Sequence, residues 1–257
     1  MATSSKPDFR TLLSDRKPVY NAWLGLGLPL GVEIAADAGW DAVMIDQQHG
    51  AGGHSELVGC LTAARAAGVP AMVRVARLDY GLIGRALDAG AQGVMVPMVE
   101  TSEDAQRLVH AVKYPPLGGR SIGPYRARLL IEGDYFASAN AWTIACGQIE
   151  TARAVGNIDA ICAVQGFDMI CIGPNDLAIS MSRGQDRDIR SPKLLEAIEH
   201  VRESAAARGV ATAIFANDLD YAKHMAAAGW QLISVGTDTG WLAAIARQML
   251  PKQMAAH

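Results

Sequence analysis

The sequence predicts a (β/α)8 barrel, the TIM-barrel fold, from three observations. The chain has 257 residues, close to the roughly 250 that one such barrel uses. Short apolar segments rich in Val, Ile and Met alternate along it with Ala-rich helical segments, a pattern typical of parallel strands that are covered on both faces. A glycine suited to end a helix precedes most of the apolar segments. We therefore expect one domain over residues 1–257.

The eight expected strands are spaced so that a helix fits between each pair. None of them alternates strictly between apolar and polar residues, which favours burial on both faces. No Gly-x-Gly-x-x-Gly turn follows the first of them, so an open sheet with a dinucleotide site is disfavoured. The expected strands are residues 19–26, 42–46, 71–75, 93–99, 145–150, 169–173, 211–215 and 232–236.

Several helix starts carry recognisable capping residues. Thr101 and Asp104 have the spacing of a capping box, and Ser191 precedes a proline suited to the first helical position. Asn217 is a candidate cap for the helix after the seventh strand. These signals support the alternation of strand and helix.

The connection over residues 114–143 is much longer than the few residues that such a barrel needs. It is rich in turn-forming residues and includes Arg120, Arg126 and Arg128. Two interpretations are open: a surface insertion without a role, or a loop and helix that lie near an active site.

The C-terminal segment at about 238–250 predicts a helix with one apolar face. This face is formed by Trp241, Leu242, Ile245 and Met249. The helix either closes the barrel wall or packs against another subunit.

The composition excludes several classes of function. The net charge of −3 and the scattered Lys and Arg residues offer no basic stripe for nucleic acid. No apolar run reaches the roughly 20 residues that span a bilayer, and the N-terminal residues lack the apolar core of a signal peptide. The four cysteines lie apart in apolar segments, as expected of buried reduced thiols. We expect a cytoplasmic protein with a small-molecule partner.

In this fold the active site is built where the strands end at their carboxyl termini. Glu150 and Asp176 follow the fifth and sixth expected strands. Two close carboxylates repel each other unless something neutralises them, and oxygen ligands favour a hard cation such as Mg2+ or Mn2+, with Co2+ or Zn2+ as alternatives. The other interpretation is that both are loop acids satisfied by helix N-termini.

His49 is the only one of the six histidines at the end of an expected strand. A histidine there is suited to act as a general base near neutral pH, with a carboxylate to orient its ring, and Asp46 and Asp88 are the candidates for that carboxylate. Arg74 interrupts an apolar strand, so it either stabilises a carboxylate or oxyanion in the site or forms a structural ion pair. None of the six lysines ends a strand, which disfavours chemistry through a Schiff base.

Taken together, the segments MIDQQHG, MVRV, PMVETSEDA, YPPLGGRSIGP, QIET and IGPNDL resemble those of the HpcH/HpaI family of class II pyruvate aldolases, over almost the whole chain. The resemblance implies metal ligands at Glu150 and Asp176, a base at His49 and an arginine, Arg74, that stabilises an enolate. The chain departs from the family pattern at Gln48, where Glu is common, and at Asn175, where Ala is frequent.

The resemblance also implies a pocket for pyruvate and an aldehyde as substrates. Backbone amides at Asn175 and Asp176 would hold the pyruvate carboxylate, next to Gly173 and Pro174, and Gln148 and Trp23 would line the pocket. The implied reaction is the reversible cleavage of 4-hydroxy-2-oxo acids, and the implied assembly is a homohexamer. Two alternatives remain open: a lyase of malyl or citryl thioesters, and a protein that binds 2-oxo acids without turnover.

Overall fold

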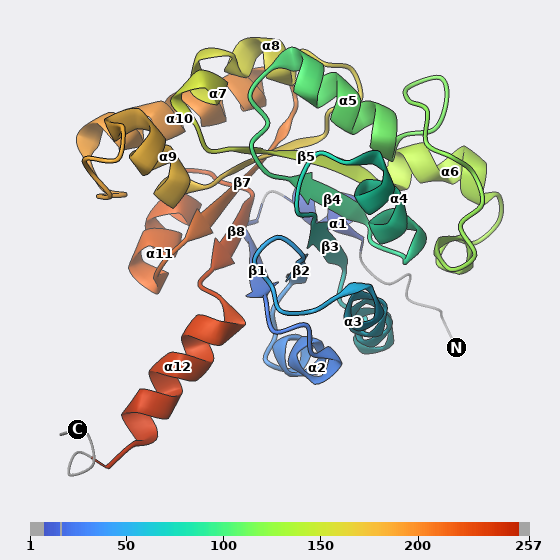
Figure 1. Ribbon diagram of the computed structural model, residues 1–257, viewed down its shortest axis with the longest axis horizontal. Helices are drawn as coiled ribbons and strands as arrows, with labels where there is room; N and C mark the ends of the chain where they lie inside the picture. The colour runs from blue at the N-terminus through green and yellow to red at the C-terminus, as the bar shows by residue number, and fades with distance from the viewer. Residues whose placement is uncertain (1–7, 16, 252–257) are drawn as a thin grey trace.

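The computed structural model describes residues 8–15 and 17–251, and it confirms the predicted barrel. Eight parallel strands pair in sequence order into a closed barrel surrounded by helices (Figure 1). All eight expected strands are present. They are β1 (Val19–Leu24), β2 (Ala42–Asp46), β3 (Ala71–Arg74), β4 (Gly93–Val96), β5 (Ile144–Ile149), β6 (Met169–Ile172), β7 (Ala211–Ala216) and β8 (Leu232–Val235).

The helices of the outer layer follow the strands in turn. They are α2 (Pro29–Asp37), α3 (His54–Ala67), α4 (Tyr80–Asp88), α5 (Ser102–Val112), α6 (Tyr135–Trp142), α7 (Ala152–Gly156), α8 (Ile158–Cys162), α9 (Pro174–Ser182), α10 (Pro192–Ala207), α11 (Leu219–Ala227) and α12 (Asp238–Met249). Helix α1 (Phe9–Ser14) precedes the barrel, and a 3-10 turn, η1, covers Ala127–Leu129.

Strand β4 is shorter than its apolar segment predicts. Its pairing with β5 ends at Val96, because the next residue, Pro97, has no amide hydrogen for a ladder bond. Met98 then adopts a positive φ of 56°, a conformation that few residues other than glycine take. The chain turns sharply at the carboxyl end of β4 as a result.

The barrel interior is filled by side chains and closed at one end. Met44, Met72, Met95 and Met169 are each fully buried within it. Helix α1 covers the amino ends of the strands, where Phe9 is 1% exposed and packs into the same cluster. Among the described residues, the barrel interior opens into a pocket at the carboxyl ends of the strands, where barrels of this kind place their active sites.

One expected helix cap is wrong, and two others are confirmed in position. Thr101 and Asp104 form the predicted capping box of α5, and Ser191 is the N-cap residue of α10. Helix α11, however, is capped by Asp218, whose side chain accepts from the Tyr221 N–H, and not by Asn217. The carboxylate one residue closer to the helix occupies the capping position, which leaves the Asn217 amide free for another partner.

The long connection 114–143 lies on the outside of the helical layer. Arg120 pairs with Asp88 at the end of α4 at 2.8 Å, and the Tyr80 hydroxyl donates to the Gly119 carbonyl oxygen. The connection also contains a small core of its own around Tyr114 and Tyr135. It therefore packs against α4, outside the barrel.

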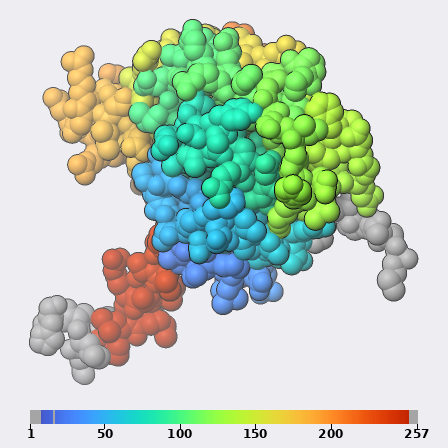
Figure 2. Space-filling model, turned by 45° about the vertical axis from the view of Figure 1, so that its right-hand side comes forward, coloured from blue at the N-terminus to red at the C-terminus, as the bar shows by residue number. Residues whose placement is uncertain are grey.

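Helix α12 does not close the barrel wall. It extends away from the other helices (Figures 1 and 2), and none of its residues is buried. It is anchored at its start, where Trp241 stacks on Trp40 with ring centroids 5.1 Å apart.

Two expectations from composition agree with the structure. All four cysteines are free and buried. Among the described residues, no helix has the length and apolar character needed to cross a bilayer.

Candidate active site

A pocket of about 350 Å³ opens at the carboxyl ends of the strands. It brings together most of the residues predicted for the site, although they come from separate strands and loops. The predicted residues that line it are Trp23, Asp46, His49, Arg74, Gln148, Gly173, Pro174, Asn175 and Asp176.

Arg74 and Asp46 form a buried ion pair in the pocket wall. They end neighbouring strands at paired register positions, and the Arg74 Nε and Nη2 groups donate to the two Asp46 carboxylate oxygens at 2.9 and 2.6 Å. Burial alone would raise the pKa of Asp46, but the hydrogen bonds and charge of Arg74 outweigh it and lower that pKa. The same guanidinium lies over the Trp23 side chain, with its central carbon 4.7 Å from the centroid of the Trp23 ring. The Arg74 side chain is thereby fixed in place.

Glu150 lies behind the pocket surface and is only 3% exposed. One of its oxygens accepts from the Met98 N–H at 2.8 Å, so the positive φ at Met98 directs a backbone donor at this carboxylate. Burial, followed by the charge of Asp176, raises the pKa of Glu150 to about 7, while the Met98 hydrogen bond and Arg74 act in the opposite direction. The negative charge of ionised Glu150 is therefore poorly stabilised by the residues around it.

Gly173 lines the pocket next to Glu150 and allows close contact there. A Cβ atom on this residue would lie 2.7 Å from the second oxygen of Glu150 and 2.9 Å from the Gln148 side-chain nitrogen. Gln148 is itself buried, and its carbonyl oxygen has no hydrogen-bond partner. Only glycine leaves room for both side chains at the pocket floor.

Helix α9 begins at the pocket edge with Pro174, and Asp176 lies in its first turn. The first amides of a helix have no partner within the helix and favour negative charge. The amides of Asn175 and Asp176 lie in this turn, so they are placed to receive a carboxylate group.

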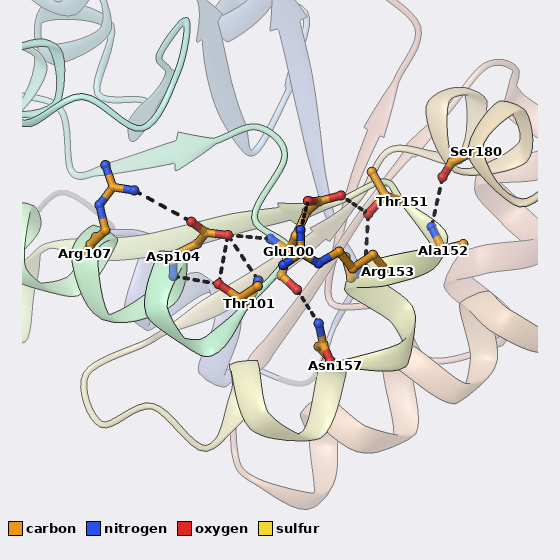
Figure 3. A network of polar contacts seen from close by, with 10 residues as sticks. Glu100, Thr101, Asp104, Arg107, Thr151, Ala152, Arg153, Asn157 and Ser180 are labelled. Atoms are coloured by element: carbon orange, nitrogen blue, oxygen red, sulfur yellow. Dashed lines mark hydrogen bonds and ion pairs between the residues drawn. The ribbon is translucent and has the colours of Figure 1, made fainter.

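Hydrogen bonds between the loops after β4 and β5 support this region (Figure 3). Glu100 accepts from the Thr151 hydroxyl at 2.8 Å through its carboxylate, and from the Asn157 side chain at 2.9 Å through its backbone oxygen. The Ala152 N–H donates to the Ser180 hydroxyl of α9 at 3.0 Å. The segment that follows Glu150 is thus tied both to the β4 loop and to the helix that carries Asp176.

The structure separates the two carboxylates predicted to orient His49. The His49 side chain lines the pocket and is exposed, and its backbone N–H lies 3.4 Å from an Asp46 oxygen. The Asp46 carboxylate binds Arg74 through both of its oxygens. Asp88 ends α4 on the opposite side of the barrel, where it pairs with Arg120. Within one chain Asp88 is therefore not brought to the pocket.

Several lining residues were not singled out by sequence reasoning. Leu26, Phe215 and Thr239 carry no chemical signature, although Phe215 lies near the end of β7 and the other two closely follow β1 and β8, so that the fold places all three there. Asp238 accepts from the backbone N–H groups of Gly25 and Leu26 at 2.8 and 3.1 Å. It joins the loop after β1 to the start of α12.

No lysine lines the pocket among the described residues. This agrees with the expectation from the strand ends. Lys17, Lys113, Lys193 and Lys223 all lie elsewhere, and Lys6 and Lys252 fall outside the described residues.

Comparison with known proteins identifies the family. The model of the HpcH/HpaI aldolase/citrate lyase family matches residues 20–244. The chain belongs to this family. It is similar to a hydroxypyruvate/pyruvate aldolase of Rhizorhabdus wittichii, with 36% identity over 241 residues that cover 94% of this chain and 96% of the relative. A 5-keto-4-deoxy-D-glucarate aldolase of Shigella dysenteriae is 32% identical over 234 residues, 90% of this chain and 91% of the relative.

A solved HpcH/HpaI family structure agrees with the fold as well. The HpcH/HpaI aldolase/citrate lyase family protein from Burkholderia cenocepacia has a TM-score of 0.85 and 35% identity, over 93% of this chain and 95% of that chain. The predicted family is confirmed. The predicted class of enzyme, a carbon–carbon lyase, is confirmed as well, because the two similar HpcH/HpaI relatives are named aldolases.

Proposed function

We propose that the protein is a metal-dependent aldolase that reversibly cleaves 4-hydroxy-2-oxo acids into pyruvate and an aldehyde. The observation that carries the proposal is the placement of a buried, poorly compensated Glu150 beside Asp176, with a fixed Arg74 in the same pocket. The described lining residues include no lysine for a Schiff base. Negative charge that develops on a substrate oxygen would then have to be stabilised by cations.

The donor set at Glu150 and Asp176 fits a divalent cation with oxygen ligands. The described residues contain no cluster of three or more His, Cys, Asp or Glu side chains suited to a metal, so the protein would supply two carboxylates. Mg2+ in proteins commonly binds one or two carboxylates and completes its shell with water and substrate oxygens. We propose Mg2+ or Mn2+, with Glu150 and Asp176 as ligands. The bound ion would supply Lewis acidity that polarises the substrate ketone.

The remaining residues divide the work of binding and proton transfer. The amides at the start of α9 hold the pyruvate carboxylate, and Gln148 and Trp23 confine the substrate between them. Arg74 faces the charge that builds on the ketone oxygen, since Asp46 and Trp23 hold its guanidinium in one orientation. His49, at the exposed side of the pocket, exchanges a proton with the reacting carbon or the aldehyde oxygen. The roles of these residues are predictions, as is a location in the cytoplasm.

Pyruvate release from 4-hydroxy-2-oxoheptanedioate tests the proposal. The protein is stripped with a chelator, assayed, and assayed again after Mg2+ or Mn2+ is added. Activity that disappears with the chelator and returns with the metal supports a metal-dependent aldolase. Chelator-resistant cleavage would contradict the metal, and no cleavage with any metal would shift the assignment to a thioester lyase or a binding protein.

We further propose that the protein forms a homo-oligomer, a hexamer by the family resemblance, with α12 packed on a second copy. Leu242, Ile245 and Met249 are 61%, 56% and 76% exposed on one side of this projecting helix. Leu30 and Ile34 on α2 are 64% and 60% exposed. Groups of exposed large apolar side chains often mark a protein–protein interface, and a second copy supplies both faces in equal number.

Light scattering coupled to size exclusion measures the assembly directly. Ile245→Glu places a charge in the apolar face and should shift the protein to smaller species, whereas Arg247→Gln, on the opposite side of the same helix, should not. A wild-type protein that is monomeric at micromolar concentration would contradict this part of the proposal.

A further inference from the structure

The side chains of Asn175 and Asn217 form a reciprocal pair across two loops of the pocket mouth. Asn175 Nδ2 donates to Asn217 Oδ1 at 3.2 Å, and Asn217 Nδ2 donates to Asn175 Oδ1 at 3.0 Å. The pair connects the first turn of α9 with the end of β7. We call these two side chains the amide latch.

Asn217 is available for the latch because its neighbour performs the capping. Asp218 accepts from the Tyr221 N–H at 2.8 Å and binds the Arg190 guanidinium at 2.9 Å. The backbone at the end of β7 is therefore fixed from the side away from the pocket. The Asn217 amide approaches Asn175 from a fixed position and limits the rotamers open to it.

The latch leaves hydrogen-bonding capacity on Asn175 unused. A carboxamide has two N–H donors and two acceptor lone pairs, and a reciprocal pair uses one of each on either partner. Asn175 lines the pocket, whereas Asn217 does not. The remaining donor and acceptor of Asn175 are thus at the mouth of the pocket, one residue before Asp176.

Another part of the pocket lining bears hydroxyl groups. Thr237 and Thr239 line it, with their hydroxyl oxygens 2.9 Å apart. Among the described lining residues Arg74 is the only Lys or Arg, and Asp46 already binds it through both carboxylate oxygens. A neutral hydroxyl group matches these side chains better than a second carboxylate, since the described lining residues offer no further Lys or Arg to compensate its charge.

We propose that the amide latch determines a preference for hydroxylated aldehydes. Asn175 binds a hydroxyl group of the aldehyde, and Asn217 acts as a positioning residue that holds the Asn175 amide toward it. This inference rests on the proposed aldolase function.

The test compares glycolaldehyde with acetaldehyde as acceptors for pyruvate in the Mg2+-loaded enzyme. The two aldehydes differ by one hydroxyl group, and the ratio of their kcat/KM values does not depend on how much of a variant is folded. Asn175→Ala should lower the ratio of glycolaldehyde to acetaldehyde about five- to tenfold, the usual worth of one neutral hydrogen bond. Asn217→Ala should lower it about two- to threefold. The double variant should match Asn175→Ala, because Asn217 acts only through Asn175.

Asn157→Ala is the matched control, since it removes another asparagine hydrogen bond, to the Glu100 carbonyl, outside the pocket. It should leave the ratio unchanged. A ratio that stays at the wild-type value in Asn175→Ala, or that falls as far in the control, overturns the latch and leaves the aldolase assignment intact. A wild-type enzyme that joins pyruvate to neither aldehyde overturns the proposed function and the latch with it.

Discussion

Replacing Asp46 by Asn should weaken both the fold and the catalysis, because this carboxylate neutralises a buried arginine. The two side chains are joined by hydrogen bonds of 2.9 and 2.6 Å, and their exposed fractions are only 10% for Arg74 and 5% for Asp46. Asn keeps the volume of Asp, so no cavity forms, but it removes the charge and turns a donor toward the guanidinium.

The expected magnitude follows from burial. Breaking a buried ion pair on one side costs about 3–5 kcal/mol, because the remaining charge is left without a partner. We expect the low end, about 3 kcal/mol, since Asn retains one acceptor oxygen. For a chain of this length that corresponds to a fall in Tm of roughly 10 °C. A displaced Arg74 should also lower kcat/KM by about 100-fold.

Urea unfolding and steady-state kinetics measure the two effects, with Asp159→Asn as the control. Asp159 also pairs with an arginine, but at 3.4 Å and with 67% of its side chain exposed, so its loss should cost less than about 1 kcal/mol. The low pKa of Asp46 means that the pair stabilises the fold above the usual carboxylate pKa and loses this effect as the pH falls through the lowered value. The deficit of Asp46→Asn should therefore persist from pH 5 to 8. A variant within 1 kcal/mol of wild type and with full activity would refute the assigned role.

Three further predictions concern the floor and the base of the barrel. Gly173→Ala should lower kcat/KM at least tenfold, because its Cβ would meet Glu150 at 2.7 Å and Gln148 at 2.9 Å; kinetics at saturating metal check this. Metal affinity measured by calorimetry should fall about tenfold per unit as the pH drops below 7, because protons compete for Glu150, whose pKa burial raises to about 7. Lys113→Met should cost about 2 kcal/mol in urea unfolding without changing kcat, because it removes the buried one of the two cations that pair with Asp168 at the base of the barrel, 2.7 Å away, and leaves only Arg10 at 2.6 Å.

Each of these three predictions has an outcome that contradicts it. Full activity in Gly173→Ala would show that the contact at the pocket floor is not needed. A metal affinity that is constant between pH 6 and 8 would remove Glu150 from the ligands. A cost below 1 kcal/mol for Lys113→Met would mean that the buried pair is replaced without loss by an apolar side chain.

The strands could be predicted from the sequence because burial on both faces requires a short run of apolar residues in each strand. Each is a short apolar run with little alternation, and a closed barrel places the residue after every run at one end. Asp176 and Gln148 could therefore be assigned to one pocket although they lie in different segments. Strand β4 ends earlier than predicted because Pro97 cannot donate a ladder hydrogen bond, and an apolar pattern alone does not reveal this.

The remaining features depend on side-chain contacts that no short sequence pattern indicates. Asp46 and His49 are close in sequence, but the register of β2 and β3 places Asp46 opposite Arg74, and the two form an ion pair. An amphipathic helix has the same pattern whether its apolar face is covered by its own barrel or by another chain, so the course of α12 could not be decided. The pairing of Asn175 with Asn217 joins residues 42 positions apart, and neither forms part of a recognisable motif.

Exchange of the pyruvate methyl protons with deuterated solvent, followed by NMR without any aldehyde, tests the central claim most directly. The account predicts rapid exchange with Mg2+ or Mn2+, loss of exchange with chelator, and a rate reduced at least 100-fold in Glu150→Gln and in Arg74→Ala. Pyruvate that binds in the presence of metal without exchanging its protons would contradict the account, because the pocket would then bind a 2-oxo acid without forming its enolate.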